Sequence, residues 1–210
     1  GLGDVYKRQP VNKLLVTMSL PIVISMLIQA MYNLVDSVFV AQINPDALTA
    51  VGMAFPMQSL MIAFQTGLGV GMNALVSRYL GQKKPYEAGL AATHALILTA
   101  LNYVIFLIVG LTAIPAFFSI QTHSEIIAGY GVEYLSIVCC GSLGLFFQIY
   151  GERILQATGK TLLSMVSQIL GAVINIVLDP VFIFGVDFLG IPAMGVTGAA
   201  IATVTGQIIA

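Results

Sequence analysis

Long apolar runs separated by short polar segments make up most of the chain. A helix that crosses a bilayer needs about 20 consecutive apolar residues, and six runs reach or approach that length. We place the predicted spans at about residues 14–43, 47–76, 88–118, 126–149, 162–184 and from 193 onward. The pattern predicts an all-α, polytopic membrane protein whose six transmembrane helices form one bundle.

The two ends of the chain differ from this pattern. Residues 1–9 match nothing that follows, so we treat them as a tail whose native origin stays open, and residues 10–210 as one transmembrane lobe. The last run has about 18 residues and no polar flank. We therefore expect the chain to be a fragment or one half of a longer protein.

Composition excludes a soluble domain. Of the 210 residues, 58% are hydrophobic and 8% are charged, whereas soluble domains carry about 25% charged residues. The two cysteines, Cys139 and Cys140, are adjacent within an apolar run. That spacing is typical of neither a disulfide framework nor a metal site.

The basic residues predict the orientation in the membrane. All eight precede the first span or lie in the loops after the second and fourth spans: Lys7, Arg8, Lys13, Arg78, Lys83, Lys84, Arg153 and Lys160. The opposite loops contain Asp46, Glu125 and Asp187 but no Lys or Arg. By the positive-inside rule, we expect a multi-pass protein of the inner (plasma) membrane with a cytoplasmic N-terminus.

Three acids lie within predicted spans: Asp36, Asp179 and, near an outer edge, Glu133. Asp179 is the only charged residue in the fifth span, where a carboxylate costs about 2.5–3.5 kcal/mol on insertion scales. Asn175 precedes it by one helical turn on the same face, and Pro180 predicts a bend in the helix. Asp36 lies in the first span, in which Pro21 also predicts a bend. Acids deep in a membrane, such as Asp36 and Asp179, usually face a bundle interior or a water-filled cavity.

These side chains have two interpretations. Two acids that share a poorly solvated site repel each other when both are ionised, and a bound proton or sodium ion removes the repulsion. Alternatively, Asp36 and Asp179 are a hydrogen-bonded clamp between helices. Asn175 either orients Asp179, offers its carbonyl oxygen to a cation or joins two helices. Thr197 and Thr203 are of a type common in packed membrane helices.

Other polar positions occur in the first two spans and at span ends. We expect some of those in the first two spans to line a cavity and the rest to join helices: Gln29, Tyr32, Asn33, Gln65 and Asn73. Glu152 and Arg153 are assigned, with Lys160, to the loop after the fourth span. His94 is expected near the inner end of the third span.

Catalytic motifs are absent from the sequence. It contains no Walker-type nucleotide loop and no plausible catalytic triad, and the short loops leave no room for a soluble domain. We therefore predict that the protein is not an enzyme and has no cofactor besides a coupling ion, sodium or a proton. The predicted partners are the lipid bilayer and small molecules, not nucleic acid.

Six segments carry a resemblance to a known family. They are residues 21–25 (PIVIS), 32–40 (YNLVDSVFV), 52–56 (GMAFP), 151–159 (GERILQATG), 175–180 (NIVLDP) and 195–203 (GVTGAAIAT). In this order and spacing, they resemble the multidrug and toxic compound extrusion (MATE) transporters. The resemblance covers about residues 10–210 and corresponds to the N-terminal six-helix lobe.

The resemblance implies a twelve-helix protein with two lobes around a central cleft, of which the C-terminal lobe is missing from this chain. It implies cation-driven efflux of drug-like, often cationic, compounds. It also implies a site for a proton or sodium ion at four positions: Asp36, Asn175, Asp179 and Thr197. A helix-four tyrosine near that site corresponds to Tyr134, and the bending proline of helix one corresponds to Pro21.

Two other functions are alternatives to efflux. A flippase for lipid-linked precursors of related architecture would need basic residues inside the lobe to meet phosphate charge, and the predicted spans contain no Lys or Arg. A membrane-embedded enzyme would need a nucleophile–base pair or a metal cluster. The residue types do not distinguish sodium coupling from proton coupling, and they do not identify the drug.

Overall fold

The computed structural model describes residues 11–186 and 190–210. This part of the chain forms six α-helices and a single isolated bridge between Val186 and Ile191. The helices are α2 (Val11–Ala41), α3 (Pro45–Gly81), α4 (Pro85–Gln121), α5 (Glu125–Ala157), α6 (Thr161–Phe184) and α7 (Val196–Ile209). The predicted all-α bundle is confirmed, and residues 1–9 and Asp187 lie outside the described residues.

Turn chemistry explains where the helices begin. Pro45 and Pro85 start α3 and α4, and proline is well tolerated at the first helical position because that N–H has no helical partner. Asn44 caps α3, and its side-chain oxygen accepts a hydrogen bond from the backbone N–H of Ala47 at 2.6 Å. The short polar turns therefore end one span and begin the next.

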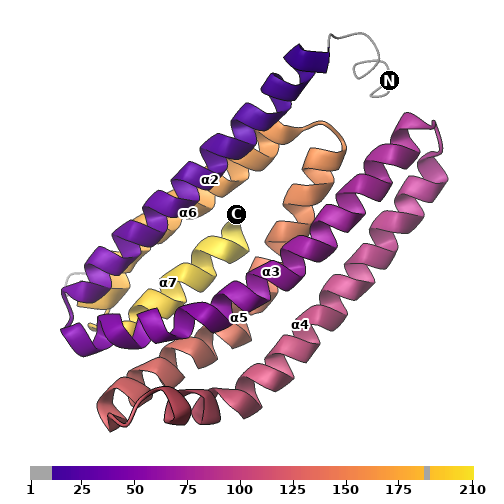
Figure 1. The fold of residues 1–210 in the computed structure, drawn as a ribbon. Coiled ribbons are helices and arrows are strands. Elements are labelled where there is room, and N and C mark those ends of the chain that lie inside the picture. The colour runs from indigo at the N-terminus through magenta and orange to yellow at the C-terminus, as the bar shows by residue number, and fades with distance from the viewer. Residues whose placement is uncertain (1–10, 187–189) are drawn as a thin grey trace.

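The helices form a bundle of two parts joined by α7. Helix α5 packs against α3, α4 and α7, while α6 packs against α2 and α7. Figure 1 shows α2 and α6 side by side, with α7 between them and α5. The start of α2 and the α3–α4 and α5–α6 connections lie at one end of the bundle, and the other short connections lie at the opposite end.

Glycines bring α6 and α7 close together. A Cβ atom at Gly206 would lie 2.9 Å from the Gly171 carbonyl oxygen and 3.1 Å from the Asn175 Cβ. A Cβ atom at Gly198 would lie 2.4 Å from the Phe182 carbonyl oxygen. Small residues allow membrane helices to approach in this way, and here they place α7 directly against the face of α6 that carries Asn175.

Three predicted boundaries are wrong. The second and fourth helices continue to Gly81 and Ala157, well past the ends of their apolar runs, because polar side chains there find partners in the bundle. The last helix begins at Val196 rather than near residue 193. The backbone N–H groups of Met194 and Gly195 instead bond to the Phe182 and Ile183 carbonyls.

Five described helices are long and apolar enough to cross a membrane, and α7 is a shorter apolar helix of 14 residues. The protein is therefore a multi-pass membrane protein. Helices α2 and α6 continue through Pro21 and Pro180. The bends expected at these two prolines stay predictions.

Candidate functional site

The two intramembrane acids lie on the adjacent helices α2 and α6. Asp179 is completely buried, and Asp36 is 8% exposed. They are close enough for their charges to interact. Asn175, also buried, donates a hydrogen bond from Nδ2 to Asp179 Oδ1 at 3.4 Å. The packing of α2 on α6 therefore brings together three of the four positions implied by the resemblance.

Each of these three side chains has a buried oxygen with no hydrogen-bond partner among the residues that the structure describes. The atoms are Asp36 Oδ1, Asn175 Oδ1 and Asp179 Oδ2. A buried polar atom left without a partner costs roughly 1–3 kcal/mol. Carboxylate and amide oxygens are ligands of hard cations, and a carboxylate also accepts a proton. The arrangement is suited to binding either ion.

Thr197, the fourth implied position, bonds to another acid in this structure. Its hydroxyl, on α7, donates a hydrogen bond to the Glu133 carboxylate on α5. The structure thus pairs Thr197 with a third acid, which is exposed, and not with Asp36 or Asp179. The sequence alone did not connect Glu133 with this threonine, since the two lie 64 positions apart.

Tyr134 lies beside the acids. Its side chain is 2% exposed, and its hydroxyl accepts a hydrogen bond from Gln58 Nε2 on α3 at 3.2 Å. The tyrosine is within electrostatic range of both Asp36 and Asp179. Gln58, which sequence reasoning missed, therefore fixes the orientation of a ring next to the acid pair.

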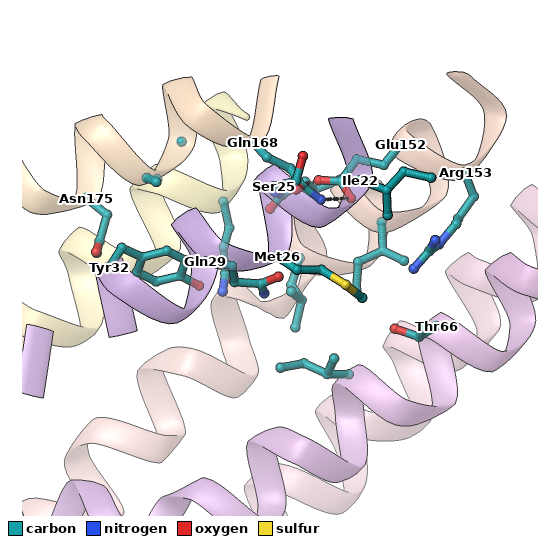
Figure 2. A pocket seen from close by; sticks show the side chains of 18 of the residues that line it. Ile22, Ser25, Met26, Gln29, Tyr32, Thr66, Glu152, Arg153, Gln168 and Asn175 are labelled. Carbon is teal, nitrogen blue, oxygen red and sulfur yellow. Dashed lines mark hydrogen bonds between the residues drawn. The ribbon is translucent and has the colours of Figure 1, made fainter. Parts of the chain in front are cut away.

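A cavity of about 300 Å³ lies within the lobe, and Asn175 is one of the side chains that line it. Side chains from α2, α3, α5, α6 and α7 line it, and Figure 2 shows Asn175 and Tyr32 toward one end and Arg153 toward the other. Its polar lining includes Gln29, Tyr32, Gln148, Glu152, Gln168 and Gln207. Tyr32 is within electrostatic range of Asp36 and Asp179, and also of Glu152.

Glu152 is the main residue whose place the sequence analysis misjudged. It was assigned to a loop, yet it lies on α5 and is 5% exposed. Gln148 Nε2 donates to its Oε1 at 3.0 Å, and Gln168 Nε2 on α6 donates to its Oε2. The spacing of Gln148 and Glu152, one helical turn, is the signal that would have indicated a shared face.

Arg153 also lies on α5 and lines the cavity. Arg153 lies outside the predicted fourth span, but the helix continues past that span and places the arginine in the lobe. One guanidinium nitrogen, Nη1, donates to Gln156 Oε1 at 2.8 Å. A Cβ atom at Gly69 would lie 2.7 Å from the Arg153 Cγ, so the absence of a side chain on α3 makes room for the arginine.

The remaining polar positions separate into three groups. Gln29, Tyr32 and Thr203 line the cavity. Gln65 instead joins helices, since its Nε2 donates to Thr99 Oγ1 at 3.0 Å and to the Phe146 carbonyl at 3.1 Å. Three others lie elsewhere: Asn33 is exposed, Asn73 pairs with Ser77 on its own helix, and His94 lines a separate groove between α3 and α4.

Known transport proteins resemble this chain over nearly its whole length. The chain is 28% identical to a FAD transporter of Shewanella oneidensis over 201 residues, which are 96% of this chain and 44% of that protein. It is 26% identical to the multidrug export protein MepA of Staphylococcus haemolyticus, over 98% of this chain and 44% of that protein. The chain thus spans less than half the length of these relatives.

Solved structures share the fold. One is the outward-facing conformation of a multidrug resistance MATE family transporter of the MOP superfamily, with 34% identity and a TM-score of 0.86 over 94% of this chain and 42% of that one. Another is a MOP superfamily transporter from Pyrococcus furiosus, with 34% identity and a TM-score of 0.88 over 96% of this chain and 43% of that one. The MatE family profile matches residues 21–181. The chain therefore belongs to the MatE family of membrane transporters.

Proposed function

We propose that residues 10–210 are the N-terminal lobe of a secondary active transporter that exports drug-like, often cationic, compounds in exchange for sodium ions or protons. A second lobe completes the central cleft. The relatives support export: MepA is a multidrug export protein, and YoeA of Bacillus subtilis is a probable multidrug resistance protein. Their names favour this function over a flippase for lipid-linked precursors.

The acid pair carries the proposal for coupling. Asp36 and Asp179 are buried within electrostatic range of each other, and each has an oxygen with no partner among the described residues. When both are ionised they repel, and a bound proton or sodium ion removes that repulsion. The repulsion biases the lobe between two shapes if these differ in their affinity for the cation. Asn175 holds Asp179 in position, and Thr197 completes the site when its hydroxyl leaves Glu133.

Helix α2 is the proposed moving part, because Asp36 and Pro21 lie on the same helix. Cation uptake from the outside neutralises the pair, α2 changes its bend, and the drug leaves the cleft. Loss of the cation to the cytoplasm restores the repulsion and the drug-binding shape. In this scheme the protein lies in the plasma membrane with its N-terminus in the cytoplasm, as the distribution of Lys and Arg indicates.

A substrate of the opposite charge is the second candidate. One relative is a FAD transporter, and Arg153 supplies a guanidinium at the cavity. Arg binds phosphate groups well. Uptake of labelled FAD into the same proteoliposomes, compared with a cationic dye, distinguishes the two substrates.

The test is efflux of a fluorescent cationic dye from proteoliposomes that contain the intact transporter, with an imposed sodium or proton gradient. We expect one of the two gradients to drive efflux. Asp36→Asn mimics a permanently neutral acid and should abolish gradient-driven efflux while the protein still folds. Asp46→Asn, which changes an exposed acid in the first turn of α3, is the control. Normal coupled efflux by the Asp36→Asn variant would rule out this coupling site.

A further inference from the structure

A groove separate from the cavity described above runs between α3 and α4. These helices lie side by side and are joined at one end by the short connection of residues 82–84 (Figure 1). The groove is lined by side chains from residues 67–79 of α3 and 87–98 of α4. Its volume of about 710 Å³ is within the range of ligand pockets.

Glycines leave the groove unfilled. Gly67 and Gly71 lie one helical turn apart on α3, and a Cβ atom at either would meet nothing within 4 Å. Met72 and Ala95, which are both buried, lie at the base of the groove. The glycines of α7 bring two helices into contact, whereas these two glycines leave a space that an external apolar group can occupy.

The walls of the groove are apolar over the depth of one lipid leaflet. Leu75, Leu90 and Leu98 line it and are exposed. Tyr79 follows Gly67 by 12 positions, so the groove is about 18 Å long at a helical rise of about 1.5 Å per residue. One leaflet contributes about half of the roughly 30 Å hydrocarbon core of a bilayer. The groove therefore matches one lipid acyl chain in length and polarity.

Charges of both signs lie at the end of the groove next to the α3–α4 connection. Glu87, exposed in the first turn of α4, lines the groove. Lys83 and Lys84 are exposed in the connection itself. The backbone N–H of Lys84 donates to the carbonyl oxygen of Tyr79, another lining residue, at 2.9 Å. This end of the groove therefore presents a carboxylate to a cation and lysine ammonium groups to an anion.

The headgroup of phosphatidylethanolamine matches this arrangement. Its ammonium carries N–H bonds that a carboxylate accepts, and its phosphate accepts N–H bonds from lysine. A glycerol headgroup brings no cation to Glu87, and a choline headgroup brings a cation without N–H bonds. His94 also lines the groove but lies two turns deeper, where its Nδ1 is 2.8 Å from the Leu90 carbonyl oxygen.

We propose that the α3–α4 groove binds a phosphatidylethanolamine molecule of the surrounding bilayer. One acyl chain lies along the groove over Gly67 and Gly71. The ammonium bonds to Glu87, and the phosphate bonds to Lys83 and Lys84. Binding of this lipid depends neither on the compound that the transporter exports nor on the coupling ion. The second lobe is the competing occupant of the groove, and the test below distinguishes the two.

Matched lipids test the proposal. The purified intact transporter is mixed with phosphatidylethanolamine, phosphatidylcholine and phosphatidylglycerol that carry identical acyl chains, and the lipid that stays bound is measured by native mass spectrometry. We expect the wild type to retain phosphatidylethanolamine at least about threefold over each of the other two lipids. Glu87→Gln should lower the ratio of bound phosphatidylethanolamine to phosphatidylcholine to about 1, because the charge that the N–H bonds meet is lost.

Gly71→Leu tests the groove independently of its charges. The new side chain occupies the open space over α3, so it should abolish the selective retention of phosphatidylethanolamine. Gly52→Leu is the control on the same helix, since Gly52 lies outside the lining and a Cβ atom there also meets nothing within 4 Å. Glu125→Gln, an exposed acid at the start of α5, is the control for charge. Thermal unfolding checks that each variant is folded.

A photoreactive lipid locates the bound molecule. Phosphatidylethanolamine with a diazirine in one acyl chain is cross-linked to the intact transporter, and the modified peptides are identified by mass spectrometry. We expect modification within residues 67–98 of the wild type and its loss in Gly71→Leu. Cross-links confined to other segments, as expected if the second lobe covers the groove, would overturn the proposal.

The lipid site and the proposed function can fail separately. Equal retention of the three lipids, a preference for phosphatidylglycerol, or unchanged retention by folded Glu87→Gln and Gly71→Leu overturns the lipid site even if the transporter pumps dye. Lipid binding that follows the prediction, together with efflux that no cation gradient drives, upholds the lipid site and contradicts the coupling mechanism.

Discussion

Asn175 donates a hydrogen bond to Asp179 one turn further along α6, and this pair connects the acid site to the cavity. The amide Nδ2 lies 3.4 Å from the carboxylate Oδ1, while the amide side chain also lines the cavity. Asp179 itself is completely buried. A ligand that binds the Asn175 oxygen would therefore act on the side chain that bonds to Asp179, one acid of the proposed coupling pair.

We predict that Asn175→Ala impairs coupling more than folding. The change removes the hydrogen bond to Asp179, and loss of the donor to a buried carboxylate costs roughly 1–3 kcal/mol. Efflux at saturating dye should fall by at least about 10-fold, with a modest fall in the unfolding temperature. Asn33→Ala, at an exposed position of α2, is the control. An efflux rate equal to that of the wild type in Asn175→Ala would contradict a role of this amide in coupling.

A second prediction concerns the other acid of the pair. Asp179→Asn removes the charge that repels Asp36 and keeps the shape of the side chain, so the variant should fold at least as stably as the wild type because a completely buried charge is lost. Gradient-driven efflux should disappear. Thermal unfolding and dye efflux are measured on the same preparation. A variant that unfolds easily but still couples would favour the clamp interpretation over an ion site.

A third prediction tests the proposed movement of α2. Proline lacks an N–H and removes a helical hydrogen bond to the carbonyl four residues earlier, which for Pro21 is that of Thr17. Pro21→Ala restores this bond and stiffens the helix, so we expect normal expression and a lower efflux rate per molecule. Pro115→Ala makes the same change in α4, which carries neither acid. Equal effects of the two substitutions would contradict a special role for Pro21.

A fourth prediction concerns topology. Lys83 and His123 are exposed and lie in the connections before and after α4, so they should face opposite sides of the membrane. Single cysteines at these positions, in a background with Cys139 and Cys140 replaced by alanine, are labelled in intact cells with a membrane-impermeant maleimide. Only the cysteine at position 123 should react. Labelling of both from outside would contradict the orientation.

A fifth prediction concerns the close contact of α6 with α7. Gly206→Val places a Cβ where the Gly171 carbonyl oxygen is only 2.9 Å away, so the helices must separate. Overpacking of this kind typically costs about 1–3 kcal/mol, and we expect a lower unfolding temperature. Gly89→Ala, where a Cβ atom would meet nothing within 4 Å, should leave stability unchanged or raise it slightly. Equal stability of the two variants would show that the contact is not tight.

Local sequence determined the helices and the acids of interest. Apolar runs of span length form helices in a bilayer because the backbone groups must then bond within the segment, and Pro45 and Pro85 mark two of the starts. The same reasoning identified Asp36 and Asp179 as residues of the bundle interior, since a carboxylate in lipid is costly. Both are buried in the structure.

Only the tertiary structure decided which partners the polar side chains have. Thr197 pairs with Glu133, 64 positions away, and Glu152 accepts a bond from Gln168, 16 positions away on another helix. The burial of Glu152 depends on the packing of α5 against α6, which supplies Gln168. In the sequence alone, its charge was interpreted as a sign of a loop. Hydropathy is a property of one segment, whereas a cavity and its partners depend on the packing of several.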